Sequence, residues 1–176
     1  MSDDYTIRLA GARDLALLPH IEREAARRFE PYGLAGVMGT VVSGAEDFAA
    51  AHAEGRLWVA ADAQNAPVGF ATAGIVGDNA HLDELDVLPE HGRRGLGSAL
   101  VRAVHGWALH QGFPAVTLTT LDGIPWNQPF YARLGYHVVI PADLSEPLRQ
   151  LLTAEIARGL PGEGRVAMCR PLSPPL

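Results

Sequence analysis

The stretch from His81 to Val101, HLDELDVLPEHGRRGLGSALV, constrains the possible folds of this chain more than any other. An apolar strand ends at a proline and gives way to a glycine-rich turn that opens a helix. Gly92, Gly95 and Gly97 allow the backbone to approach a ligand closely and to adopt positive φ where needed. The first amides of the helix have no partners inside it and lie at the positive end of its dipole. The turn therefore predicts an anion site.

The charges of the turn and the spacing of its glycines indicate which anion it binds and which phosphate-binding folds it does not fit. Arg93 and Arg94 add two full positive charges, which favours pyrophosphate as the guest. The glycines follow G-x-x-G-x-G, whereas a dinucleotide-binding turn has the reverse order of gaps, G-x-G-x-x-G. A P-loop requires a lysine, and this chain contains none. Both of these phosphate-binding folds are therefore disfavoured.

The turn resembles motif A of the GCN5-related N-acetyltransferases, the GNAT superfamily. In that motif a strand ending in V-x-P is followed by Q/R-x-x-G-x-G/A at the start of a helix. Val87 to Pro89 match the strand end, and Gly95 and Gly97 match the two glycines. Gly92 departs from the pattern, because the family usually has Gln or Arg there. The two neighbouring arginines are candidate substitutes for that side chain.

A second segment, PWNQPFYARLGY from Pro125 to Tyr136, resembles the closing segment of the same superfamily, N…Y-x-x-L-G-F/Y. The matching residues are Asn127, Tyr131, Leu134, Gly135 and Tyr136. The two motifs occur in the family's order, and the resemblance runs from about His81 to Val139.

The resemblance and the hydrophobic patterning together predict the fold class. We expect an α/β (α+β) GNAT fold, with a mixed, mostly antiparallel central sheet of about seven strands, flanked by helices and splayed at the central strand. The predicted strands are Tyr5–Leu9, Leu57–Ala61, Val68–Val76, the strand ending at Val87, Ala115–Thr120, Tyr136–Ile140 and Arg165–Cys169. The predicted helices run from Leu15 to Ala25 with Asp14 as cap, from Gly44 to Glu54, from the turn to Gly112, after the cap Asn127, and after the cap Ser145.

Composition predicts one domain over residues 1–176, because 48% hydrophobic content in 176 residues is enough for a single core. The net charge of -6 argues against a nucleic-acid partner. No stretch is apolar enough to cross a membrane, and the acidic N-terminus is unlike a signal peptide. Cys169 is alone and cannot form an internal disulfide. We therefore expect a cytoplasmic protein with no membrane partner.

The resemblance implies acetyl-CoA as co-substrate. The seven histidines are scattered without metal-binding spacing, so we expect no metal. In the family the pantetheine arm runs along the central strand, where the N–H of Val87 is the expected donor to the oxyanion. The predicted coenzyme-binding residues are Leu85, Asp86, Val87, Gly92, Arg93, Arg94, Gly95, Leu96, Gly97, Ser98 and Asn127.

Transfer to an amine needs a base, because an alkyl amine with a pKa of about 10 is mostly protonated at neutral pH. Glu84 and Asp86 lie two apart in a strand and should share one face. Glu84 is the first candidate for the base, Asp86 the second and His81 the third. The resemblance assigns Tyr131 as the general acid that protonates the leaving thiolate.

The acceptor stays open at this point. The segment Phe29 to Gly36 reads as a loop in the region where the family binds acceptors, so Phe29, Glu30 and Tyr32 are candidate substrate contacts. A small-molecule amine and a peptide N-terminus are both compatible with the sequence. Two alternatives to acetyl transfer also stay open, a non-catalytic acyl-CoA-binding sensor module and an acyltransferase that uses another acyl-CoA. A homodimer paired through the C-terminal strand is one arrangement for assembly.

Overall fold

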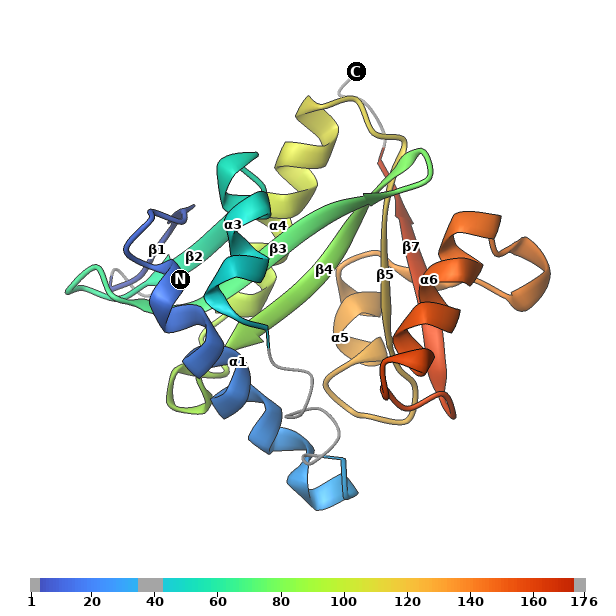
Figure 1. The fold of residues 1–176 in the computed structure, drawn as a ribbon, viewed down its shortest axis with the longest axis horizontal. Coiled ribbons are helices and arrows are strands. Elements are labelled where there is room, and N and C mark those ends of the chain that lie inside the picture. The colour runs from blue at the N-terminus through green and yellow to red at the C-terminus, as the bar shows by residue number, and fades with distance from the viewer. Residues whose placement is uncertain (1–3, 35–42, 173–176) are drawn as a thin grey trace. The chain divides into compact units, whose positions relative to one another are not determined.

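The computed structural model of the protein describes residues 4–34 and 43–172 (Figure 1). Its strands are β1 (Thr6–Leu9), β2 (Leu57–Ala61), β3 (Pro67–Val76), β4 (Asn79–Val87), β5 (Ala115–Leu121), β6 (His137–Val138) and β7 (Arg165–Pro171). The α-helices are α1 (Leu18–Ala26), α3 (Ala45–Ala53), α4 (Leu96–His110), α5 (Gln128–Arg133) and α6 (Glu146–Ala157). The 3₁₀ helices are η1 (Leu15–Leu17), η2 (Arg27–Tyr32), η3 (Pro89–His91) and η4 (Pro141–Asp143).

The strands form a seven-stranded sheet in the order β1-β2-β3-β4-β5-β7-β6. The pairs β1–β2, β2–β3, β5–β7 and β6–β7 are antiparallel. β4 and β5 are parallel, with Ala80 to Leu82 opposite Val116 to Leu118. The predicted mixed, mostly antiparallel sheet flanked by helices is confirmed. Its splay at the central strand stays a prediction.

The chain forms two compact units, one from residues 1–73 and 84–104 and the other from residues 74–83 and 105–176. The expectation of a single domain over residues 1–176 stays a prediction. The first unit holds α1, α3, the strands β1 and β2, the end of β4 and the predicted anion turn before α4. The second unit holds the start of β4, the strands β5 to β7, and α5 and α6.

The core of the first unit forms where α1 and α3 pack on β2 and β3. Apolar residues of α1 recur at spacings of three and four, which gives the helix one buried face. Phe48 of α3 meets Phe70 of β3 edge to face, with ring centroids 5.2 Å apart. The buried cluster consists of Ala10, Leu18, Ile21, Phe48, Leu57, Val59 and Phe70.

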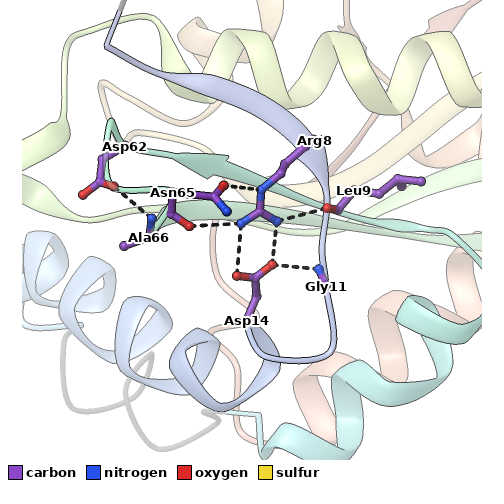
Figure 2. A network of polar contacts seen from close by, with 7 residues as sticks. All are labelled: Arg8, Leu9, Gly11, Asp14, Asp62, Asn65 and Ala66. Atoms are coloured by element: carbon purple, nitrogen blue, oxygen red, sulfur yellow. Dashed lines mark hydrogen bonds and ion pairs between the residues drawn. The ribbon is translucent and has the colours of Figure 1, made fainter.

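A charged network holds the end of β1 to the β2–β3 turn (Figure 2). Arg8 Nη1 donates to Asp14 Oδ2 at 2.6 Å, and Arg8 Nε donates to Asn65 Oδ1 at 2.9 Å. Asp14 also accepts from the N–H of Gly11 at 2.7 Å. The prediction that Asp14 caps the first helix is wrong for its side chain, which makes no cap hydrogen bond. A buried carboxylate gains more from a guanidinium and a turn amide than from a helix end.

The second unit is organised by β5 and β7, which pair over seven residues each and lie side by side next to α6 in Figure 1. A buried ion pair joins α6 to β7, with Arg165 Nε 2.8 Å from Glu155 Oε2. Thr119 of β5 donates to Glu155 Oε1 at 2.8 Å, so each carboxylate oxygen has a partner. β6 is shorter than the predicted strand Tyr136–Ile140, because Pro141 begins η4 directly afterwards.

Candidate functional site

The predicted anion turn is built by η3 and the start of α4. The N–H of Gly92 donates to the carbonyl of Pro89 at 3.1 Å, which closes η3. Gly92 has an ordinary φ of -63°. A Cβ at Gly92 would lie 3.0 Å from that carbonyl oxygen, closer than side chains normally approach. Glycine at this position is therefore explained by space rather than by positive φ.

Positive φ occurs at two other positions of the turn. Gly95 has φ +81°, as predicted for one of these glycines, and Arg93 has φ +60°, which the sequence did not indicate. Arg93, Arg94 and Gly95 are exposed, while Leu96 is buried and anchors the helix start. The N–H of Ala99 donates to the carbonyl of Gly95 at 3.0 Å, so the amides of residues 96–98 precede the first helical bond of α4. These amides and two exposed guanidinium groups suit an anion.

Tyr5 braces this turn from the N-terminal segment. Its hydroxyl is hydrogen-bonded to His91 Nδ1 at 2.8 Å, and the two rings meet edge to face. The guanidinium of Arg94 lies 5.9 Å from the centroid of the Tyr5 ring, within cation–π range. Sequence reasoning missed Tyr5, because it lies 86 residues from His91 and in no motif.

The end of β4 places two predicted acids beside each other. Glu84 and Asp86 are both partly buried as residues, but Oδ2 of Asp86 is shielded from solvent and has no hydrogen-bond partner among the residues described. Burial raises the pKa of Asp86 well above its usual range. The charges of Glu84 and Glu22 raise that pKa further, while the charge of Arg28 lowers it.

Glu22 of α1 is a functional candidate that sequence reasoning did not select. It is buried, although acids are rarely buried, and its Oε2 accepts from the N–H of Ser43 at 2.9 Å. Burial raises the pKa of Glu22 above its usual value. A signal was present in the sequence, since Glu22 directly follows Ile21 on the apolar face of a helix.

The predicted acceptor residues lie in η2 rather than in a loop. Phe29 is half-buried, Tyr32 is 42% exposed, and Glu30 is exposed and 3.4 Å from Arg27 Nε. A 3₁₀ turn tolerates Pro31, and Gly33 ends the turn with φ +68°. The end of the predicted loop, residues 35 and 36, lies outside the described residues.

His81 belongs to the second unit and has a structural partner. Its side chain is buried, and Nδ1 is hydrogen-bonded to Thr117 Oγ1 of the neighbouring strand at 2.8 Å. Burial lowers the pKa of His81 to about 4, so the ring is neutral at pH 7. These features favour a packing role over that of a base.

Tyr131 also lies in the second unit, on α5, inside a group of aromatic side chains. Its ring meets Phe130 and Tyr136 edge to face, with centroids 5.0 Å and 5.8 Å away. The hydroxyl of Tyr136 is hydrogen-bonded to His105 Nε2 at 2.8 Å. Burial raises the pKa of Tyr136, and Tyr131 raises it further. Tyr136 is therefore a neutral, fixed surface against which the Tyr131 ring packs.

Asn127 occupies the predicted N-cap position of α5, but its side chain makes no cap hydrogen bond. Its backbone carbonyl instead accepts from the amides of Phe130 and Tyr131, at 2.9 Å and 3.1 Å. The explanation of Asn127 as a side-chain cap is wrong, and its amide group is available for another contact.

Other chemistry finds little support in the structure. The described residues contain no group of three or more His, Cys, Asp or Glu side chains arranged to hold a metal ion. Cys169 is partly buried, and burial raises the pKa of its thiol, which disfavours the reactive thiolate. Within the described ranges 4–34 and 43–172, every helix is too short or too polar to cross a membrane.

The model of the acetyltransferase (GNAT) family matches residues 20–136, which is more than half of the chain. This chain belongs to the GNAT family. The match covers both motifs from which the resemblance was inferred.

Relatives of this GNAT protein agree with that assignment. An uncharacterised protein of Bacillus subtilis, YyaT, is 30% identical over 98 residues, which are 55% of this chain and 64% of YyaT, so the match spans less than two thirds of that relative. The crystal structure of the PaiA N-acetyltransferase of Thermoplasma acidophilum in complex with coenzyme A superposes with a TM-score of 0.70 at 17% identity, over 98% of this chain and 100% of that one. The crystal structure of the ribosomal-protein-S18-alanine N-acetyltransferase of Escherichia coli superposes with a TM-score of 0.67 at 20% identity. The superposition covers 98% of this chain and 96% of that one. At these identities the two structures show a shared fold.

Proposed function

We propose that this protein is an N-acetyltransferase that moves an acetyl group from acetyl-CoA to a primary amine. The observation that carries the proposal is the turn before α4, where unpaired amides, Arg93, Arg94 and a left-handed Gly95 precede the helix in a chain of the GNAT family. Crystallisation of the Thermoplasma relative with coenzyme A supports a coenzyme A thioester as donor.

The coenzyme would be held by two stretches of the first unit. Gly92, the exposed residues Arg93, Arg94 and Gly95, and the amides of Leu96, Gly97 and Ser98 would bind the pyrophosphate. The backbone of Leu85, Asp86 and Val87 would pair with the pantetheine arm, and the N–H of Val87 would stabilise the oxyanion, which is worth about 3 kcal/mol for such a donor. The uncapped amide of Asn127 is a further candidate contact.

The proposed reaction is direct attack without a covalent acyl-enzyme. The base takes a proton from the acceptor ammonium, and the amine nitrogen forms a bond to the thioester carbonyl carbon. The tetrahedral intermediate then breaks its C–S bond, and the thiolate takes a proton from the phenol of Tyr131. The nitrogen gives up its second proton as the intermediate collapses, and that proton, through solvent, restores the phenol. The products are an acetamide and coenzyme A as the free thiol. Glu84 is the first candidate for the base. A packing role explains His81 better.

The acceptor in this proposal is a small-molecule amine or a peptide N-terminus, with Phe29, Glu30 and Tyr32 of η2 as candidate contacts. The catalytic scheme uses no metal. We infer that the protein acts in the cytoplasm, because a single cysteine suits a reducing compartment. Another acyl-CoA as donor is a second candidate, because the turn recognises the pyrophosphate and not the acyl group.

Release of free thiol from acetyl-CoA in the presence of an amine panel tests the proposal. We expect amine-dependent release, a loss of about 10²-fold or more in kcat for Tyr131→Phe, and a comparable loss for Glu84→Gln. Tyr131→Phe keeps the ring that packs on Phe130 and Tyr136 and removes only the hydroxyl.

Glu46→Gln, on the exposed first turn of α3, is the matched control for Glu84→Gln and should retain full activity. Unchanged turnover in both Tyr131→Phe and Glu84→Gln would show that the role assignments are wrong. Tight binding of acetyl-CoA without release against any amine would favour the non-catalytic sensor module.

A further inference from the structure

Arg93, in the turn before α4, has a backbone conformation that arginine rarely adopts. Its φ of +60° lies in the left-handed region, where a Cβ crowds the backbone. Asn65 is the other non-glycine residue with positive φ among residues 4–34 and 43–172, and asparagine tolerates that conformation well. Arg93 is exposed, so packing of its own side chain does not hold it. Such a conformation persists only where neighbouring contacts fix it.

Tyr5 supplies contacts on both sides of Arg93. Its hydroxyl is hydrogen-bonded at 2.8 Å to Nδ1 of His91, which precedes Arg93 in the turn. The guanidinium carbon of Arg94, the residue directly after Arg93, lies 5.9 Å from the centroid of the Tyr5 ring, close enough for cation–π attraction. One side chain therefore holds the turn both before and after its left-handed residue.

Tyr5 is itself held by a well-anchored strand of the same unit. It directly precedes β1, in which Thr6 pairs with Ala61 of β2. An ion pair of 2.6 Å between Arg8 and Asp14 fastens the same strand further along (Figure 2). A site supported by regular secondary structure keeps its geometry better than one supported by loops alone. The position of the Tyr5 ring is therefore set by the sheet.

We propose that Tyr5 is a positioning residue for the coenzyme. It fixes Arg93 in the left-handed conformation, and so holds the amides of the turn in their binding arrangement before the coenzyme arrives. The proposal rests on the proposed function, because this turn is the proposed pyrophosphate site. Preorganisation raises affinity, because the turn loses little further freedom when the ligand binds.

Two variants of Tyr5 test this role by calorimetric titration with coenzyme A. Tyr5→Phe removes the hydrogen bond to His91 and keeps the ring beside Arg94, whereas Tyr5→Leu removes both contacts. We expect the Kd for coenzyme A to rise by about tenfold in Tyr5→Leu and by less in Tyr5→Phe. The reason is that Arg93 relaxes in the free variant and has to return to positive φ on binding. An unchanged binding stoichiometry verifies that each variant is folded.

Substitutions of Arg93 separate positioning from a general stabilisation of the fold. Arg93→Ala and Arg93→Gly both remove the guanidinium, but only glycine adopts positive φ without steric cost. With Tyr5 present the two variants should bind coenzyme A equally, because the turn is already fixed. In the Tyr5→Leu background, Arg93→Gly should bind about tenfold more tightly than Arg93→Ala. A purely structural role of Tyr5 would lower the unfolding midpoint and leave this ratio unchanged.

Three outcomes would overturn the inference. These are wild-type affinity of Tyr5→Leu for coenzyme A, the same ratio of affinities between Arg93→Gly and Arg93→Ala in both backgrounds, and no binding of coenzyme A by the wild type.

Failure of the proposed function has a different signature. If the ratio changes as expected but acetyl-CoA releases no thiol with any amine, the positioning role of Tyr5 stands and acetyl transfer does not. Amine-dependent thiol release together with wild-type affinity of Tyr5→Leu would leave the transferase and remove the role of Tyr5.

Discussion

Asp86 and Asp14 are two carboxylates of the first unit whose surroundings shift their pKa values in opposite directions. Burial acts against the charged form of Asp14, but the guanidinium of Arg8 and the N–H of Gly11 outweigh it, so the pKa of Asp14 lies below its usual value. Asp86 has no such partner at Oδ2, and its pKa is raised. The surroundings thus favour the charged form of Asp14 and disfavour the charged form of Asp86.

The raised pKa of Asp86 predicts a pH-dependent stability of the free protein. Stability from this group is fully present below its unfolded pKa of about 3.9 and is lost as pH rises through the raised folded value. Asp86→Asn should therefore raise the unfolding midpoint at pH 8, by about 2–4 °C for each kcal/mol gained, and by less at pH 5.

Thermal unfolding of the wild type and the variant at pH 5 and pH 8 checks this prediction. Glu84, Glu22 and Arg28, whose charges act on Asp86, are present in both proteins, so the difference between them reports on Asp86 and its interactions with these groups. Asp14 loses its contribution only as pH falls through its lowered pKa, outside this range. An equal or larger midpoint for the wild type at pH 8 would contradict the account of Asp86.

For individual residues, the sequence predicted part of the candidate site. The two-residue period of a strand placed Glu84 and Asp86 together, and the structure gives an electrostatic and hydrogen-bonding contact between them. Tyr5 was out of reach, because it meets His91 only through tertiary packing. The helical pattern placed Glu22 on the apolar face of α1, but its contact with Ser43 also depends on tertiary packing. The choice of base among acids depends on burial, which a sequence does not report for a strand end.

The turn and α4 form the element on which coenzyme binding depends. Gly95 and Gly112 lie at opposite ends of this helix, with φ of +81° and +80°, and a Cβ at either position would meet no atom within 4 Å. The two positions therefore have the same conformational requirement, and only one of them lies in the proposed pyrophosphate site.

Gly95→Ala and Gly112→Ala form a matched pair for this reason. Each should cost about 1 kcal/mol of stability, because a left-handed conformation disfavours a Cβ by that order. Only Gly95→Ala should weaken coenzyme A binding, by about tenfold or more, because its strain shifts the amides that would hold the pyrophosphate. Calorimetric titration with coenzyme A measures both, and equal affinities for the two variants would argue against this turn as the site.

The ends of helices and strands were predicted well where a glycine or proline terminates the element. Gly55, Gly112 and Gly135 end helices with positive φ, and β2 has the predicted bounds. The caps were predicted less well: Asn127 and Ser145 stand at N-cap positions, yet neither side chain makes the cap hydrogen bond. A residue type favours a position, but its side chain chooses among partners that only the folded chain supplies.

For the whole chain, the fold was predictable because two motifs and the alternation of apolar residues agree with one another. The sheet order and the family match confirm it. The net charge of -6 gave only a weak preference for cationic partners.

The central claim is that the turn from Gly92 to Ser98 binds the pyrophosphate of a coenzyme A thioester. Calorimetric titration of the protein with acetyl-CoA, with free coenzyme A, NADH and ATP alongside, tests it most directly. The account predicts binding of acetyl-CoA and coenzyme A in the micromolar range, about -8 kcal/mol, and much weaker binding of NADH and ATP. No binding of either acetyl-CoA or coenzyme A would contradict it, and the proposed transferase activity would fall with it.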